Sequence, residues 1–198
     1  MILMKDYELD RILTPAFKLF LTYNYESVST SKLETATGLT RGAIFYKLKT
    51  KEEIFVAVID KYVLKAQSSI IVTDSLQDYI DEYINRIKDR MIYISSLGID
   101  NMHRSYFRLL DQAVQYYPNF NQKIVDIFNN DLERWKNAIE FARNKGEIKQ
   151  SCNVEELAQR FRYTYSGLSF ERSLLNGLDI EELKTLYYSF YNEIKYGE

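Results

Sequence analysis

Residues 29–51 read STSKLETATGLTRGAIFYKLKTK, and the interpretation of the whole chain depends on them. Ser29 and Thr40 are residue types that cap helix N-termini, and Gly38 between them is suited to end a helix. The stretch therefore predicts a helix, a glycine turn and a second short helix.

The same stretch predicts one buried and one basic face. Leu33 and Ala36 are expected to point inward from the first helix, and Ile44 and Leu48, four residues apart, share one face of the second. The stretch holds five basic residues and only Glu34 as an acid, although the whole chain has a formal net charge of -2. A local basic patch on a mildly acidic chain indicates an anionic partner. The basic residues are Lys32, Arg41, Lys47, Lys49 and Lys51.

The composition predicts an all-α protein. The 198 residues are 46% hydrophobic, enough for a sizeable core, and include only seven glycines and two prolines. No segment alternates strictly between apolar and polar residues for long, which argues against strands. The single Cys152 excludes an internal disulfide, and no signal-like start or membrane-spanning apolar run is present. We therefore expect a cytoplasmic protein with no membrane partner.

Apolar spacing gives the helices on either side of this stretch. The first is expected over about 6–23, with Pro15 kinking it. Thr50 and Glu53 fit a capping box, which opens a long helix expected to reach about residue 69 and to couple two parts of the chain mechanically. Further helices are expected at 75–97, 102–116, 120–144, 154–175 and 180–196, with breaks at glycine-, proline- and asparagine-containing segments.

One set of residues at characteristic spacing runs from the first helix into the helix after Thr50. It comprises Ile12, Leu13, Ala16, Leu19, Phe20, Tyr25, Leu33, Ala36, Gly38, Leu39, Thr40, Arg41, Gly42, Phe45, Tyr46, Lys49, Thr50, Lys51 and Glu52. With this spacing, residues 11–62 resemble the DNA-binding region of the TetR/AcrR family of bacterial transcriptional regulators. The chain departs from the family pattern at Asn24, Glu34, Thr37 and Leu48. We expect Asn24 to take the left-handed conformation of the usual glycine, and Glu34 and Thr37 to alter the surface rather than the fold.

The resemblance implies a homodimeric helix-turn-helix protein that binds double-stranded DNA at an inverted-repeat operator, with a variable C-terminal domain for a small-molecule effector. The expected domains are 1–50 for DNA binding and 51–198 for effector binding and dimerisation.

Residue types divide the expected DNA face into two groups. Arg41, Ala43 and Lys47 suit base edges, and Gly42 allows close approach of the backbone. The candidates for phosphate contact are Thr40, Tyr46 and Lys51, together with Ser29 and Thr30 at the start of the preceding helix. The alternative for each residue taken singly is a solvated charge or a surface aromatic.

The middle helices carry candidates for an effector pocket, which would suit an apolar or aromatic molecule. The alternative is that these aromatic residues form ordinary core. The candidates are Met91, His103, Phe107, Phe128 and Trp135.

The last two helices carry apolar stripes that would form half of a four-helix bundle in a dimer. Gly167 in mid-helix indicates either close approach of a second subunit's helix or ordinary packing within one chain. The expected interface residues are Leu157, Phe161, Gly167, Leu168, Leu183, Tyr187, Phe190 and Ile194.

The sequence thus favours a DNA-binding transcriptional regulator, a repressor released by a hydrophobic or aromatic effector, over two alternatives. An enzyme is disfavoured because one histidine and one cysteine build no evident triad, and no cofactor or metal site is expected. The second alternative is an all-α protein-interaction module, or a regulator that responds to no small molecule.

Overall fold

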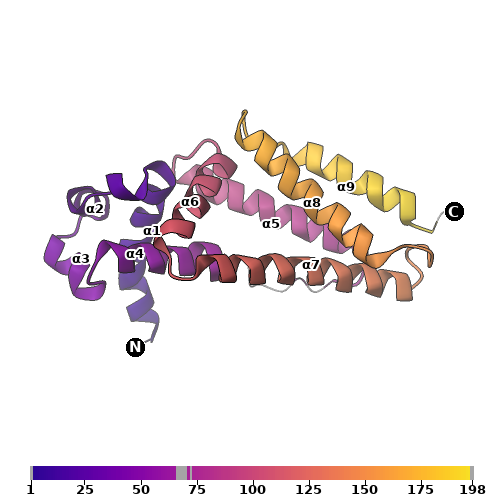
Figure 1. The fold of residues 1–198 in the computed structure, drawn as a ribbon, viewed down its shortest axis with the longest axis horizontal. Coiled ribbons are helices and arrows are strands. Elements are labelled where there is room, and N and C mark those ends of the chain that lie inside the picture. The colour runs from indigo at the N-terminus through magenta and orange to yellow at the C-terminus, as the bar shows by residue number, and fades with distance from the viewer. Residues whose placement is uncertain (1, 66–70, 72, 197–198) are drawn as a thin grey trace. The chain divides into compact units, whose positions relative to one another are not determined.

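The computed structural model describes residues 2–65, 71 and 73–196, and these residues form helices without a single strand (Figure 1). One isolated antiparallel bridge joins Ile148 to Lys195. The all-α prediction is confirmed. The helices are α1 (Ile2–Thr22), α2 (Thr30–Thr37), α3 (Arg41–Lys47), α4 (Lys51–Ile59), α5 (Leu76–Ser96), α6 (Met102–Tyr116), α7 (Phe120–Asn144), α8 (Val154–Ser173) and α9 (Ile180–Ile194), with a 3-10 turn at Tyr25–Ser27 and a π-helical stretch at Asp60–Leu64.

The helices fall into two compact units. The N-terminal unit comprises Met1–Ser69 and Ser105–Ile124, and the C-terminal unit comprises Ile70–Arg104 and Val125–Glu198. Helix α6 begins in the C-terminal unit and ends in the N-terminal one, and α7 runs the opposite way. These packing units do not bear on the functional division into 1–50 and 51–198, which stays a prediction.

Aromatic packing holds the N-terminal unit together. The Phe20 ring meets the Phe55 ring edge-on at a centroid distance of 4.9 Å, and the Tyr25 ring meets Phe55 at 5.2 Å. Phe20 and Phe55 are completely buried, which stabilises the fold by about 1.5–3 kcal/mol for each side chain. Pro15 lies inside α1 and does not end the helix. The apolar face predicted for α1 is therefore buried in the core of the N-terminal unit.

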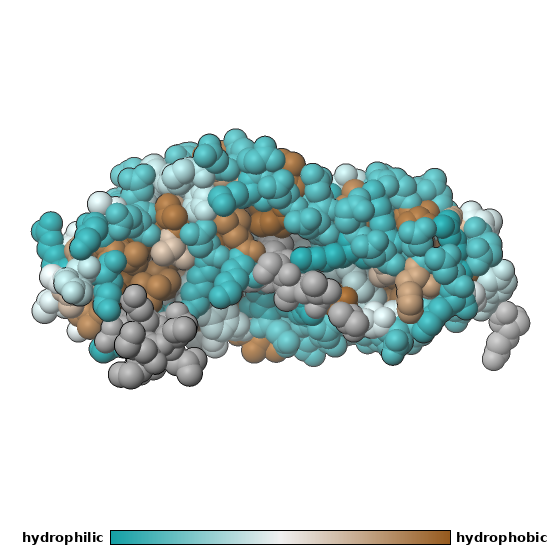
Figure 2. Space-filling model, turned by 90° about the horizontal axis from the view of Figure 1, so that it is seen from below, coloured by the Kyte–Doolittle hydropathy of each residue, from teal (hydrophilic) through white to brown (hydrophobic). Residues whose placement is uncertain are grey.

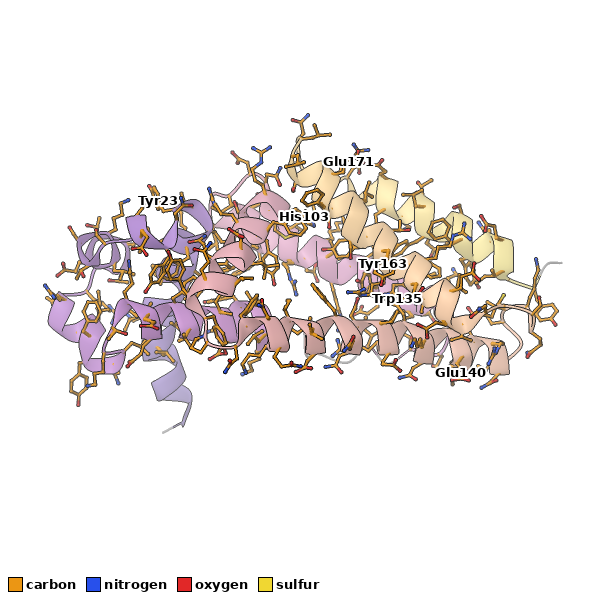
Figure 3. The ribbon with its side chains drawn as sticks, viewed as in Figure 1. Tyr23, His103, Trp135, Glu140, Tyr163 and Glu171 are labelled. Carbon is orange, nitrogen blue, oxygen red and sulfur yellow. The ribbon has the colours of Figure 1, made fainter. Side chains whose placement is uncertain are left out.

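The C-terminal unit is built around Trp135, which α7 directs toward α8 (Figure 3). Its indole stacks on the Phe161 ring at 4.7 Å, and the Tyr187 ring packs edge-on against Phe161 at 5.1 Å. The Tyr187 hydroxyl donates a hydrogen bond to the carbonyl oxygen of Phe161 at 2.9 Å. This core joins α7, α8 and α9.

Seven of the eight expected dimer residues contribute to this core. Leu157, Phe161, Leu183 and Tyr187 are buried within their own chain, and the half-buried Leu168, Phe190 and Ile194 pack against the same core. The apolar stripes of α8 and α9 are buried inside this unit, because the nearest apolar surfaces belong to the same chain. Among the eight residues, Gly167 alone is exposed.

The ends of several elements differ from those expected. The helix after Thr50 becomes π-helical at Asp60–Leu64, and its expected end near residue 69 lies outside the described residues. Asn24 has φ −66° and ψ 149°, so its expected left-handed conformation is wrong. Ala36 is exposed rather than turned inward, because Leu33 alone fills that face of the short α2. On the face shown in Figure 2, the surface is mostly hydrophilic, with hydrophobic residues in small groups.

Candidate nucleic-acid interface

The two helices of the turn begin and end as their sequence predicts. The Ser29 hydroxyl oxygen accepts a hydrogen bond from the Lys32 amide at 3.2 Å, and the Thr40 hydroxyl oxygen accepts one from the Ala43 amide at 3.3 Å. Gly38 ends α2 in the left-handed conformation, with φ 66°. Local capping therefore sets the start of α3 and the direction in which it leaves the turn.

Glu34 and Thr37 build this turn, which corrects their expected surface role. The Glu34 carboxylate accepts the Arg41 amide at 2.8 Å and so ties α2 to the start of α3. The Thr37 hydroxyl donates to the Leu33 carbonyl at 2.7 Å and accepts the Leu39 amide at 3.2 Å. Because the Arg41 amide is already bonded, α3 offers fewer free amides to a phosphate than its sequence suggests.

One face of α3 is open to solvent while the opposite face is buried. Ile44 has no exposed surface, whereas Tyr46 is 75% exposed. The remaining predicted base-edge and close-approach residues of α3 are also exposed, namely Arg41, Gly42, Ala43 and Lys47. A β-carbon built on Gly42 would meet no atom within 4 Å, so packing inside the chain does not explain a glycine here.

A hollow of about 410 Å³ borders this face, and it brings in a residue of α1 that sequence reasoning missed. Its walls include Arg11, Ile12 and Leu39 together with Gly42, Ala43, Tyr46 and Lys47. Arg11 precedes the buried Ile12 and is itself exposed. In the sequence, Arg11 stands beside the apolar face of its own helix, and nothing there indicates that α3 would lie next to it.

Lys51 makes an internal contact that its sequence position did not reveal. Its ammonium donates to the Tyr25 carbonyl oxygen at 3.0 Å and lies 4.1 Å from the centre of the Tyr25 ring. A cation in the first turn of a helix opposes the helix dipole, and these two contacts offset that cost. The phosphate contact expected of Lys51 stays a prediction.

The start of α2 supplies the last two candidates. Ser29 is exposed and Thr30 is half-buried. Lys32, one turn further on, donates to the Ser27 carbonyl oxygen at 2.9 Å and lies 4.0 Å from the centre of the Tyr23 ring. The cations around this turn are therefore held by backbone oxygens and aromatic rings.

The five expected effector residues differ in burial and in position. Met91 and His103 line a hollow of about 330 Å³ in the C-terminal unit. Trp135 is completely buried in the core, whereas Phe128 is 47% exposed at the surface. Phe107 is half-buried and belongs to the N-terminal unit. Helical spacing indicated that these residues share apolar helix faces, but it could not predict which of them would be buried in the core and which would be exposed.

His103 is buried and neutral. Its Nε2 atom lies 3.3 Å from the Tyr165 hydroxyl, and only 4% of the residue is exposed. Burial, with a smaller contribution from the positive charge of Arg90, lowers the pKa of His103 to about 4. The ring is therefore uncharged at neutral pH.

The described residues offer neither a membrane span nor a cluster of metal ligands. No helix in residues 2–65 or 73–196 is long and apolar enough to cross a membrane. The same part of the chain holds no group of three or more metal-ligating residues placed to bind an ion.

The chain is similar to bacterial transcriptional regulators, both in a family model and in whole-chain comparison with single proteins. Residues 12–58 match the model of the bacterial regulatory proteins of the tetR family. The chain is 36% identical over 191 residues to the HTH-type transcriptional repressor ComR of Escherichia coli (strain K12), covering 90% of this chain and 85% of that protein. It is 19% identical over 188 residues to the uncharacterized HTH-type transcriptional regulator YezE of Bacillus subtilis (strain 168), covering 88% and 91%.

Solved structures share the fold at low identity. A putative transcriptional regulator from Saccharomonospora viridis, crystallised in complex with choline, has a TM-score of 0.72 at 15% identity and covers 97% of this chain and 100% of that one. A TetR transcription regulator from Haloarcula marismortui has a TM-score of 0.73 at 13% identity and covers 96% and 100%.

Proposed function

The chain belongs to the tetR family of bacterial transcriptional regulators, and from this premise we propose that it is a repressor which a small effector releases from an inverted-repeat operator. The observation that carries the proposal is the exposed face of α3 opposite its buried Ile44, with two cations and a phenol around a glycine. The relative ComR, which is 36% identical, is itself named a repressor.

On this proposal α3 enters the major groove and its side chains divide by chemistry. Arg41 suits guanine through two hydrogen bonds, Ala43 suits a thymine methyl group, and Lys47 reaches a base edge. The phosphate contacts come from Ser29, Thr30, Thr40, Tyr46 and Lys51. Gly42 brings the backbone close to the DNA.

Selection of bound sequences from a random DNA pool tests this assignment, followed by fluorescence anisotropy on the selected site. We expect an inverted repeat, and we expect affinity to fall steeply with salt. Arg41→Ala and Lys47→Ala should relax base preference. Binding that is absent or insensitive to salt would favour the alternative, an all-α protein-interaction module.

Dimerisation is proposed through a face of α8 that the chain itself leaves uncovered. Tyr163, Phe170 and Leu174 are 56%, 56% and 65% exposed, and with Gly167 they recur at helical spacing along one side. A β-carbon on Gly167 would meet no atom within 4 Å, so packing inside the chain does not explain this glycine either. A mid-helix glycine costs up to about 1 kcal/mol relative to alanine, and the helix of a second copy supplies the missing reason.

The proposed switch is a shift between two populations, in which the effector prefers a state whose α3 helices do not fit the groove spacing. The helix starting at Thr50 is one expected lever, and contacts within the N-terminal unit support α6 as a second. The Tyr116 ring at the end of α6 stacks on Tyr25 at 4.1 Å, and the Tyr117 hydroxyl donates to the Asp60 carboxylate at 2.6 Å. Tyr25 also accepts the hydrogen bond from Lys51, so the end of α6 and the start of α4 share one partner.

A further inference from the structure

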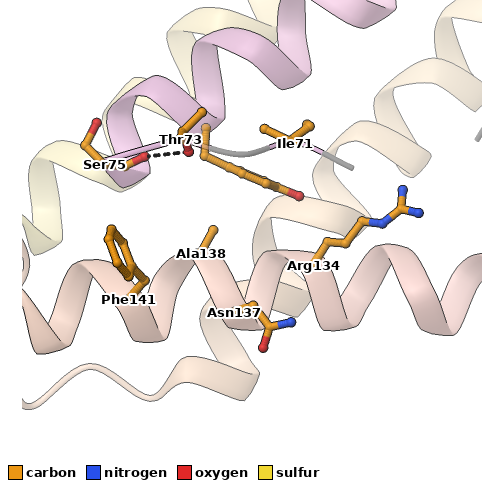
Figure 4. Close-up of a pocket in the computed structure, with 8 residues that line it drawn as sticks. Ile71, Thr73, Ser75, Arg134, Asn137, Ala138 and Phe141 are labelled. Atoms are coloured by element: carbon orange, nitrogen blue, oxygen red, sulfur yellow. Dashed lines mark hydrogen bonds between the residues drawn. The ribbon is translucent and has the colours of Figure 1, made fainter. Parts of the chain in front are cut away.

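A second hollow of the C-terminal unit lies between the start of α5 and the middle of α7 (Figure 4). It encloses about 270 Å³, close to the lower end of the range for small-molecule sites. Ile71, Ala138 and Phe141 give it apolar walls. None of the five expected effector residues is among those that line it.

Tyr79 lines this hollow and carries an unsatisfied polar group. The residue is 3% exposed, and its hydroxyl has no hydrogen-bond partner among the described residues. Leaving such a group buried and unpaired costs about 1–3 kcal/mol. Burial, assisted by the negative charge of Asp131, raises the pKa of Tyr79 above its usual value, so the hydroxyl keeps its proton and remains a donor. The ring itself is fixed, because it packs edge-on against Trp135 at 4.8 Å.

The other polar groups of the walls narrow the ligand chemistry. The Thr73 hydroxyl donates to the Ser75 carbonyl at 3.2 Å, and the Ser75 hydroxyl donates to the Asp78 carboxylate at 2.7 Å. In Figure 4 the amide of Asn137 points away from Ile71, whereas the Arg134 side chain extends on the side where Ile71 lies. Among the described wall residues, the Tyr79 hydroxyl is the buried donor without a hydrogen-bond partner, and Arg134 supplies a positive charge.

Asp131 is the acid whose negative charge acts most strongly on Tyr79, and positively charged residues oppose that charge. Its carboxylate lies 3.7 Å from the Arg162 guanidinium and accepts a hydrogen bond from Tyr83. The positive charges of Arg134 and Arg86 act on Tyr79 in the opposite direction. Arg134 also acts on Asp131, and it is the one charged side chain among the described residues that line the hollow, so a singly charged anion matches the charge of the wall.

We propose that this hollow binds a small carboxylic acid with an apolar body, its carboxylate held by Tyr79 and Arg134 and its body packed on Ile71, Ala138 and Phe141. A guanidinium matches the geometry of a carboxylate, and hydrogen bonds to an ionised group are stronger than those between neutral groups. The inference rests on the proposed function in one respect only, namely that the acid acts as the effector.

Direct binding tests the site without DNA. Trp135 is the only tryptophan of the chain and packs against Tyr79, so its fluorescence reports occupancy, and calorimetry measures the same binding independently. The probes are benzoate, phenylacetate and hexanoate, each paired with its neutral amide. We expect at least one acid to bind about tenfold more tightly than its amide, because the amide lacks the charge.

Variants separate the two donors from general effects on folding. Tyr79→Phe removes only the hydroxyl, and Arg134→Gln removes the charge, so each should weaken acid binding about tenfold. Tyr93→Phe on α5 and Arg143→Gln on α7 change the same residue types outside the hollow and should leave binding unchanged. The proposal would be overturned if Tyr79→Phe and Arg134→Gln bound the acids as tightly as the unmodified chain does. It would also be overturned if no acid bound at about 10 mM, since any affinity would then be weaker than millimolar.

A second arm asks whether the bound acid acts on DNA. With the selected operator, the acid should weaken DNA binding by the unmodified chain and not by Tyr79→Phe. If the acid binds and DNA binding does not change, the site stands and the effector role is refuted. If the operator selection fails while the acid binds, the failure concerns the proposed function alone.

Discussion

Replacing Gly42 with alanine separates the stability of α3 from its contact with DNA. The new β-carbon meets no atom of the chain within 4 Å, and the residue lies in the first turn of a regular helix. Alanine is favoured over glycine in helices, so the unfolding free energy should rise, by about 0.5 kcal/mol at this terminal position. Thermal unfolding should shift upward by about 1–2 °C for a chain of this size.

DNA affinity should move in the opposite direction. If the backbone at Gly42 approaches the groove closely, a methyl group there displaces α3 and weakens a base contact worth about 1–3 kcal/mol, which is a loss in affinity of roughly five- to 140-fold. Anisotropy with the selected operator measures this loss, and a scrambled duplex measures non-specific binding, which should change less.

Thr185→Ala on α9 is the matched control, because it raises helix propensity in the other unit without adding volume beside α3. Gly42→Ala that stabilises the protein and binds the operator as tightly as the unmodified chain would refute the close-approach argument. A loss of stability would refute the structural premise that the space beside Gly42 is open.

Three further predictions concern other contacts. Lys51→Ala should lower the unfolding free energy by about 1–2 kcal/mol, because it removes the hydrogen bond and ring contact to Tyr25, as urea denaturation can measure. It should also weaken binding to all sequences equally and flatten the salt dependence, and an unchanged salt slope would show that Lys51 neutralises no phosphate. Because the folded pKa of His103 is about 4 against an ordinary 6.5, the stability that its neutral ring contributes is present above pH 6.5 and lost as pH falls toward 4, a difference of about 3 kcal/mol. Urea denaturation at both ends of that range should therefore show a flatter pH dependence for His103→Gln, and equal slopes would exclude this cause. Gly167→Glu should shift the protein from dimer to monomer in sedimentation at equal concentration, and an unchanged dimer would place the interface elsewhere.

Most of the secondary structure could be predicted because its causes are local. Helical periodicity and capping residues act within a few positions, so α6 and α7 begin and end where the spacing placed them. Ser29, Thr40 and Thr50 each cap a helix through the hydroxyl, as the sequence indicated. One local detail differs, since the Glu53 carboxylate accepts the Lys49 amide at 2.7 Å instead of reaching back to Thr50.

The candidate site was predictable only in part. The sequence placed Arg41, Gly42 and Lys47 on the outer side of α3, where the structure has them, because Ile44 fixes the inner side. Arg11 was missed, since its place beside α3 depends on how α1 packs. Glu34 was misjudged for the same reason, as its partner is an amide beyond the turn.

The helices, their caps and the family were thus readable from the order of residues alone. The contact partners of individual side chains became known only from the way the helices pack. This packing gave Lys51 a carbonyl 26 positions away, turned the stripes of Leu157 and Tyr187 into core, and left the Tyr79 hydroxyl unpaired beside a hollow. The physical reason is that hydrophobic burial has no direction: a periodic stripe shows which side of a helix leaves water, but not which surface it meets.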